Sequence, residues 1–205
     1  MTDTEQGSPL VGDVVTVERT IAAPAEVIFA IIADPNRHQD FDGSGTVRAA
    51  KNVPAKLGLG AKFGMNMRMG LPYSMVSTVI EYDKDRRIAW QTLPPYPLVG
   101  KLAGGRIWRY ELEPVEGGTV VRESWDISQE ATPTKTGVRR MAGATEKNMT
   151  ATLERLAKLV EACSVQQLTG LDAAFLAMET HAVFGHVGSV GILDPSTSPD
   201  PVTLE

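Results

Sequence analysis

The chain has 205 residues, 42% of them hydrophobic, an ordinary composition for a globular protein with one sizeable core. Its net charge of −5 comes entirely from the region after residue 163, which contains acidic residues but no Lys or Arg. The preceding part is therefore neutral overall, which argues against nucleic-acid binding as its main task. The single cysteine, Cys163, excludes an intramolecular disulfide, and the step in composition beside it predicts a change of module.

Residues 1–12 are polar and acidic, and we expect them to form a flexible leader. They show neither the basic nor the apolar region of a signal peptide. The longest apolar run near the start, Val27–Ala33, is too short to span a bilayer. We therefore expect a cytoplasmic protein without a transmembrane segment, which could still associate peripherally with lipid surfaces.

The first expected elements are a strand and a short helix. Alternating residues over Asp13–Ile21 predict the strand. Pro24 is suited to the first turn of the helix, and Asp34–Pro35 ends it. The apolar residues of this helix have the spacing of a buried stripe, with Phe29 beside it: Val27, Ile28, Ile31 and Ile32.

Short alternating runs then predict further strands at Thr46–Ala50, Phe63–Met69, Met75–Tyr82 and Arg87–Thr92. We expect Pro72–Tyr73 to interrupt the pairing, because proline cannot donate to a strand ladder. Residues 93–102, which include three prolines, are expected to form a long loop. One face of the second run carries three methionines, whose side chains pack adaptably against irregular apolar shapes: Met65, Met67 and Met69.

The most regular stretch, Gly104–Trp125, predicts a β-hairpin with a loop of several residues around Pro114 and Gly117–Gly118. One face of the hairpin carries Trp108, Tyr110 and Leu112 from the first strand and Thr119, Val121, Glu123 and Trp125 from the second. Alternation indicates that this face is half-buried, but it leaves open whether the face meets a solid core or a cavity.

After Pro133, an apolar stripe predicts one helix of about 25 residues, from about Thr136 to Ala162. Gly137 and Gly143 weaken its first part and allow a bend there. The stripe consists of Val138, Met141, Met149, Leu153, Leu156 and Val160. The order of elements predicts an α+β fold in which this helix covers one face of a curved antiparallel sheet.

Residues 13–163 resemble the helix-grip superfamily of START-like and polyketide cyclase/dehydrase-like domains, also called SRPBCC proteins. The resemblance rests on TIAAPAEVIFAIIADPNRHQDFDGSGTV, GAKFGMNM, PYSMVSTVIEYDKDRRIAW, the hairpin WRYELEPVEGGTVVRESWD and the helix end TLERLAKLVE. It implies a deep apolar cavity between the sheet and the last helix, of a kind that holds lipids, sterols, polyketides or aromatic hormones. Some members are cyclases or dehydratases, and many only bind a ligand.

By this resemblance, ligand-binding side chains are expected at Phe29, Phe41, Met65, Met67, Tyr73, Trp90, Trp108 and Met141. Glu123 with Tyr110 is the candidate catalytic pair, because burial would raise the pKa of the Glu123 carboxyl and fit it for proton transfer. Two alternatives stay open: a strand edge where Glu123 reaches water, and a buried ion pair with Arg106 or Arg109.

Other side chains also have two interpretations. His38 and Asp42 could move a proton near the cavity mouth, or they could belong to a solvated loop. The tryptophans could stack on a flat ligand or pack in the core, and the methionines could form ordinary core or a compliant wall for a ligand. The three histidines and one cysteine lack metal-ligand spacing, and dinucleotide and phosphate-loop motifs are absent, so we expect no metal and no cofactor.

Residues 164–205 are too few to form an independent core. Their segments QQLTGLDAAFLAMET and HVGSVGILDP resemble the start of the wax ester synthase/diacylglycerol acyltransferase family. That family transfers an acyl chain from acyl-CoA to an alcohol or a diacylglycerol, and its His-His-x-x-x-Asp-Gly motif is absent here. We therefore expect an incomplete acyltransferase start, as in a truncated fusion; the alternative is a simple extension that docks its apolar stripe on the first domain.

These observations predict a protein that binds a small hydrophobic ligand in an internal cavity, with cyclase or dehydratase activity as a further possibility. The alternative is a role in lipid-ester synthesis, in which this domain serves a fused or partner acyltransferase or another acyl-CoA pathway protein. We expect no nucleic-acid partner. Whether Glu123 points into the cavity depends on strand register, since a one-residue slip would reverse its direction.

Overall fold

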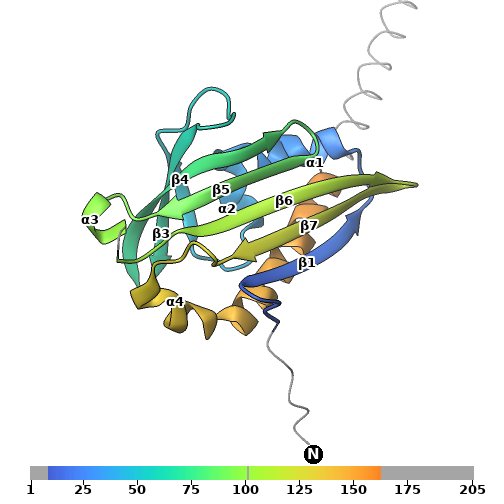
Figure 1. Cartoon of the computed structure of the whole chain (residues 1–205). Coiled ribbons are helices and arrows are strands. Elements are labelled where there is room, and N and C mark those ends of the chain that lie inside the picture. Colours follow the sequence, from blue (N-terminus) through green and yellow to red (C-terminus); the bar gives the residue numbers. More distant parts are fainter. Residues whose placement is uncertain (1–8, 101, 163–205) are drawn as a thin grey trace, which may run out of the picture. The chain divides into compact units, whose positions relative to one another are not determined.

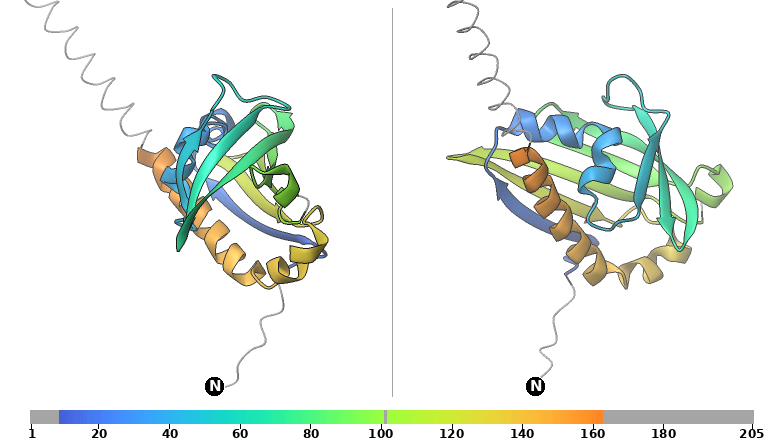
Figure 2. Two further views of the ribbon diagram at one scale, coloured as in Figure 1. Left: turned by 90° about the vertical axis from the view of Figure 1, so that its left-hand side faces the viewer. Right: turned by 180° about the vertical axis from the view of Figure 1, so that it is seen from behind.

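The computed structural model describes residues 9–100 and 102–162, which form a seven-stranded antiparallel sheet with α1, α2 and a long helix on one face (Figures 1 and 2). The strands are β1 (Val14–Ile21), β2 (Val47–Lys51), β3 (Lys62–Met69), β4 (Leu71–Asp83), β5 (Arg87–Leu93), β6 (Arg106–Val115) and β7 (Gly118–Asp126). Their order in the sheet is β1-β7-β6-β5-β4-β3-β2. The α+β architecture expected from the sequence is confirmed.

The helical elements connect and cover the strands. They are α1 (Ala25–Ile32), η1 (Pro35–Arg37), α2 (His38–Phe41), α3 (Pro97–Gly100), α4 (Thr132–Arg139) and a helix over residues 142–162, here called the long helix. Seen from behind, the long helix crosses the inner face of the sheet diagonally (Figure 2, right). It buries Met149, Leu153, Leu156, Ala157 and Val160, so the predicted stripe is the face that meets the sheet.

The single helix predicted from about Thr136 is two helices, and the break falls in the part where a bend was expected. The helical segment begins at Thr132, ends at Arg139, and is separated from the long helix by a turn at residues 140–141. Two poor helix formers, Gly137 and Gly143, flank this turn, which is where helix propensity is weakest. The turn leaves Met141 41% exposed, while Val138 and Met149 on either side of it are buried.

Two prolines that were expected to break the sheet lie inside strands. Pro72 pairs with Arg68 in β3, and Pro114 pairs with Thr119 in β7. On its other side each proline lies beyond the end of β5, whose ladder spans Arg87–Leu93. At each proline the strand therefore has a neighbouring strand on one side only. The N–H that proline lacks can be the one that would face the open side, so the ladder need not lose a hydrogen bond. The β6–β7 connection is consequently a tight turn at residues 116–117 instead of a longer loop.

The buried side chains form two clusters on the inner face of the sheet. The larger joins α1, the middle of the sheet and the end of the long helix, and includes Ile28, Phe63 and Leu156. The smaller joins β1 and β7 to α4 and the start of the long helix, and includes Trp125 and Met149. The acyltransferase-like segment, residues 164–205, lies outside the described residues, as do the first eight residues of the expected leader.

Candidate functional site

A cavity of about 640 Å³ lies between the inner face of the sheet, the α2 region and the long helix, and it is open at one end. The structure places seven of the eight expected ligand-binding side chains in its wall, together with both expected catalytic residues. These are Phe41, Met65, Met67, Tyr73, Trp90, Trp108 and Met141, with Tyr110 and Glu123. The exception, Phe29, is a core residue whose ring meets Tyr82 edge-on at 5.6 Å between centroids.

Glu123 lies on the inner face of β7, directly opposite Tyr110 on β6. Its side chain is 2% exposed, which excludes the solvent-exposed strand edge. The Tyr110 hydroxyl donates a hydrogen bond of 2.8 Å to Oε1 of Glu123, whereas the buried Oε2 has no hydrogen-bond partner among the described residues. Since an unsatisfied buried polar atom is costly, Oε2 is the atom most in need of a partner from a ligand.

The surroundings of Glu123 favour its neutral form. Burial raises the pKa of the carboxyl from 4.5 to about 8, with the hydrogen bond from Tyr110 acting in the opposite direction and the charge of Asp42 raising it further. Burial also raises the pKa of Tyr110 well above its usual value, so the phenol keeps its proton and acts as a donor. At pH 7 the pair is therefore a phenol and a carboxylic acid, both uncharged.

The alternative of a buried ion pair for Glu123 is also excluded. Arg106 binds Glu130, with 2.8 Å between Nε and Oε2, and Arg109 binds Glu81, with 2.6 Å between Nη2 and Oε1. Arg109 and Glu81 belong to the outer face of the sheet by strand alternation. Both candidate cations are thus engaged elsewhere, and Glu123 keeps its proton-transfer interpretation.

A row of aromatic rings leads from α2 to this acid. His38 stacks on Trp90 with 5.1 Å between ring centroids, and Trp90 lies 5.6 Å from Tyr110. His38 is buried, and Nε2 donates to the Ile32 carbonyl oxygen over 2.9 Å, which fixes the tautomer. Burial lowers the pKa of His38, so the ring stays neutral. The solvated-loop interpretation of His38 is therefore wrong.

Asp42 lines the same cavity but serves its own loop. Its Oδ1 accepts hydrogen bonds from the backbone N–H and hydroxyl of Ser44, and its Oδ2 accepts from the Val47 N–H. The neighbouring Gly43 N–H donates to Thr152 on the long helix over 2.9 Å, and a side chain at Gly43 would collide with the helix backbone. These contacts hold the loop on the helix and leave Asp42 as a fixed charge instead of a proton relay for His38.

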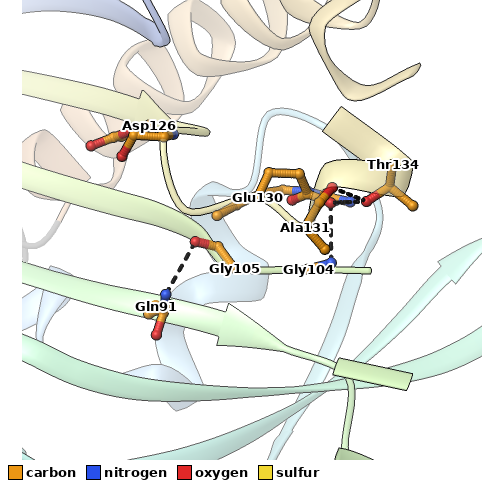
Figure 3. Close-up of polar contacts among 9 residues, drawn as sticks. Gln91, Gly104, Gly105, Asp126, Glu130, Ala131 and Thr134 are labelled. Atoms are coloured by element: carbon orange, nitrogen blue, oxygen red, sulfur yellow. Dashed lines mark hydrogen bonds and ion pairs between the residues drawn. The ribbon is translucent and has the colours of Figure 1, made fainter. Parts of the chain in front are cut away.

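At the open end of the cavity, here called its mouth, Glu130 connects the residues before β6 to the start of α4 (Figure 3). Its buried carboxylate accepts hydrogen bonds from the Gly104 N–H, the Arg106 guanidinium and the Thr134 hydroxyl. Burial alone would raise the pKa of Glu130, but the hydrogen bonds and the Arg106 charge lower it overall. Gly104–Gly105, which look like turn residues in the sequence, allow this close approach, because a side chain at Gly105 would collide with the Gln129 carbonyl.

Glu130 was missed by sequence reasoning, because its partners lie 26 residues before it and four residues after it.

A second hollow of about 480 Å³, between residues 33–36 and 53–57, contains none of the expected site residues. Within the described part of the chain, no group of three or more His, Cys, Asp or Glu side chains is placed to hold a metal. In that same part, no helix is long and apolar enough to cross a membrane.

Comparison with known proteins agrees with this geometry. Residues 13–161 match the model of a family described as polyketide cyclase/dehydrase and lipid transport. The uncharacterized protein Rv0088 of Mycobacterium tuberculosis is 39% identical over 143 residues, covering 68% of this chain and 59% of that protein. The chain thus spans about 59% of the length of the curated relatives that it matches.

Solved structures share the same fold. Protein Ms6760 of Mycobacterium smegmatis superposes with a TM-score of 0.56 at 18% identity, covering 74% of this chain and 92% of that chain. An Arthrobacter aurescens protein superposes with a TM-score of 0.58 at 15% identity, covering 73% and 87%. These likenesses confirm the helix-grip architecture and, at such identities, show the fold alone.

Proposed function

We propose that this chain, which belongs to the polyketide cyclase/dehydrase and lipid transport family, binds a small hydrophobic ligand in its cavity and meets the ligand's polar end with a neutral Glu123. The observation that carries the proposal is the unpartnered Oε2 of Glu123 in a wall rich in aromatic and methionine side chains. An apolar wall interrupted by a small number of polar groups, of which Glu123 has the unpartnered atom, is typical of small-molecule sites.

The lining supports a ligand with a bulky apolar body. A volume of about 640 Å³ lies within the range of small-molecule pockets, roughly 300–1,000 Å³. All three tryptophans of the chain contribute to the wall, and their faces can stack against flat rings. The methionines on the β3–β4 side add a wall that can adjust to irregular shapes. Sterol-like, polyketide and lipid ligands all fit this description.

Glu123 supports recognition of an oxygen on that ligand. With a pKa of about 8 the carboxyl carries its proton at pH 7 and can donate from Oε2 while Oε1 accepts from Tyr110. A ligand carbonyl or hydroxyl oxygen would then accept that hydrogen bond and satisfy the unpartnered atom. A ligand without an acceptor at this position would leave it unsatisfied and bind less tightly.

The same arrangement supports proton transfer as a further step. A neutral acid held beside a carbonyl can polarise it, and the same acid can protonate a hydroxyl that leaves as water. Glu123 would act as the general acid in either reaction, and Tyr110 would hold the carboxyl in place and stabilise the carboxylate that forms. Cyclisation and dehydration are the two reaction classes that this chemistry serves.

A ligand panel tests the proposal. The purified chain is titrated with fatty acids, sterols and aromatic polyketides while tryptophan fluorescence and the melting temperature are followed. We expect a saturable fluorescence change and a raised melting temperature with at least one class, because Trp90, Trp108 and Trp125 line the cavity. No response to any class, together with a crystal structure in which side chains fill the cavity, would refute ligand binding.

Glu123→Gln separates binding from catalysis. The amide can still donate a hydrogen bond but cannot transfer a proton, so we expect the panel ligand to bind within a few fold of wild type. If the protein is an enzyme, turnover should fall by roughly 10²–10⁴-fold. Equal turnover in Glu123→Gln and wild type would leave a binding protein without an acid catalyst at this residue.

A second candidate function rests on the segments QQLTGLDAAFLAMET and HVGSVGILDP, whose likeness to an acyltransferase start favours a link to triacylglycerol or wax ester synthesis. In that case the cavity would deliver or sense the acyl substrate for a fused or partner acyltransferase. Reading the genomic DNA past codon 205 tests this. A continuing frame that encodes the His-His motif supports it, and a stop with no acyltransferase nearby removes it.

A further inference from the structure

Exposed apolar side chains gather around the mouth of the cavity. Among residues 9–100 and 102–162, twelve large hydrophobic residues are markedly exposed, and eight of them lie in three segments there: the β3–β4 turn, the loop carrying α3, and the turn between α4 and the long helix. We call these eight the apolar rim: Met69, Leu71, Tyr73, Tyr96, Leu98, Val99, Leu102 and Met141. In both views across the sheet the three segments lie at the same end of this domain (Figure 1; Figure 2, right).

The rim is continuous with the cavity wall. Met69, Leu71, Tyr73 and Met141 belong to both, and the loop carrying α3 enters and leaves through Pro94 and Ala103, which also line the cavity. The end-on view shows the β3–β4 turn, α3 and α4 spread around this end (Figure 2, left). Leu71 and Leu98 are 80% and 76% exposed, an unusual degree for leucines that have no role on a surface.

The charge around the rim has one sign. Residues 66–75, 93–106 and 131–145 contain no Asp or Glu, and their charged residues are Arg68, Lys101, Arg106, Lys135, Arg139 and Arg140. Nearby acids are engaged: Asp13 and Glu130 pair with Lys135, Arg139 and Arg106. Asp42, whose charge acts on Tyr73, accepts hydrogen bonds from its own loop. Arg68 and Arg140 are exposed and form no ion pair with any described residue.

We propose that the apolar rim docks this domain onto an anionic lipid membrane, with the cavity mouth facing the bilayer. Apolar side chains that enter the interface, combined with cations that meet anionic headgroups, are the two contributions that hold peripheral proteins on membranes. A second copy of the chain is a less suitable binding partner for the rim, because joining two rims would bring the Arg68 and Arg140 charges of both copies together. Docking would let a hydrophobic ligand pass between bilayer and cavity without crossing water.

Vesicle co-sedimentation of the full chain tests this inference without any cavity ligand, so its outcome is separate from that of the ligand panel. We expect binding to vesicles of phosphatidylglycerol and phosphatidylcholine, weaker binding to phosphatidylcholine alone, and loss of the difference at high salt. The double variant Leu98→Ser/Leu102→Ser should lower the partition coefficient at least about tenfold, since two leucines no longer enter the interface. Neither leucine lines the cavity, so ligand binding should survive.

Matched controls come from the opposite end of the strands. Leu59→Ser removes a leucine that is 73% exposed before β3, and Arg86→Gln removes an exposed cation from the β4–β5 turn. We expect both controls to bind vesicles like wild type, whereas Arg68→Gln/Arg140→Gln should lose the preference for anionic lipid. The proposal is overturned if anionic vesicles fail to bind, if Leu59→Ser and the double leucine variant behave alike, or if the double variant instead dissolves a dimer detected by light scattering.

Discussion

Tyr110 and Glu123 face each other across the β6–β7 ladder, with the phenol donating a 2.8 Å hydrogen bond to one carboxyl oxygen and the other oxygen left without a partner. Both residues are buried, and both line the internal cavity. The proposed function rests on this phenol and carboxylic acid, and the following predictions concern the pair and the cavity around it.

Glu123 should make the stability of the protein fall as pH rises. Its pKa is about 8 in the folded state and about 4.5 when unfolded, so between these values the folded chain holds a proton that the unfolded chain has released. The free energy of unfolding should therefore fall by up to about 1.4 kcal/mol per pH unit from pH 5 to pH 8 and level off above. Glu123→Gln should remove this slope in urea unfolding series.

The control for that experiment is Glu113→Gln, which removes an exposed carboxyl from the same hairpin. The account predicts that the slope difference between wild type and Glu123→Gln clearly exceeds the difference seen with Glu113→Gln. Parallel pH profiles for wild type and Glu123→Gln would show that Glu123 ionises normally in the folded protein.

Tyr110→Phe should raise the pKa of Glu123 further. The lost hydrogen bond is the one contact that favours the carboxylate, so without it the neutral form gains. The carboxyl would also lose its donor at Oε1, and we expect a stability loss of about 1–2 kcal/mol at pH 7. NMR titration of the Glu123 side chain measures the shift, and a lowered midpoint in Tyr110→Phe would contradict the assigned role of the phenol.

Met65→Trp should fill the cavity from the β3 side. Met65 is 5% exposed and forms part of the wall, so a larger side chain can occupy the space without reaching solvent. We expect ligand-induced fluorescence changes to vanish, with a stability change of less than about 3 kcal/mol, because the added volume enters a hollow instead of a packed core. Ile80→Trp, at a position outside the cavity wall, is the control and should keep ligand binding.

Gly105→Ala should damage the mouth of the cavity. Gly105 has φ +110°, and a side chain there would collide with the backbone carbonyl of Gln129. We expect a loss of at least about 2–3 kcal/mol in unfolding free energy, since backbone must move to relieve the collision. Gly137→Ala in α4 meets open space and should raise stability slightly, by about 0.5–1 kcal/mol, so equal effects of the two substitutions would contradict the structure.

Periodicity was sufficient to predict which face of each hairpin strand is buried. It placed Tyr110 and Glu123 on one side because the β6–β7 ladder runs without a bulge, so side chains keep alternating between the two faces. It could not place Pro72 and Pro114 inside strands, since their tolerance depends on where the neighbouring β5 ends. That end is a tertiary property, which local pattern does not contain.

The site was predictable to the same extent. The resemblance to helix-grip domains indicated seven side chains of the cavity wall, but it also included Phe29, which faces Tyr82 in the core. The unpartnered Oε2 of Glu123 depends on strand register. The hydrogen bonds to Glu130 depend on segments that are distant in sequence and meet in the fold. The exact position of the break between α4 and the long helix likewise depends on tertiary contacts, although Gly137 and Gly143 mark a region of weak helix propensity.

The most direct test of the central claim is a pH titration of the Glu123 side-chain carboxyl by carbon-13 NMR, with and without the best compound of the ligand panel. The account predicts a midpoint at about pH 8 in the free protein and a further upward shift when the ligand excludes water and accepts a hydrogen bond from the acid. A midpoint near 4.5 that ligand does not move would contradict a neutral, ligand-facing acid in this cavity.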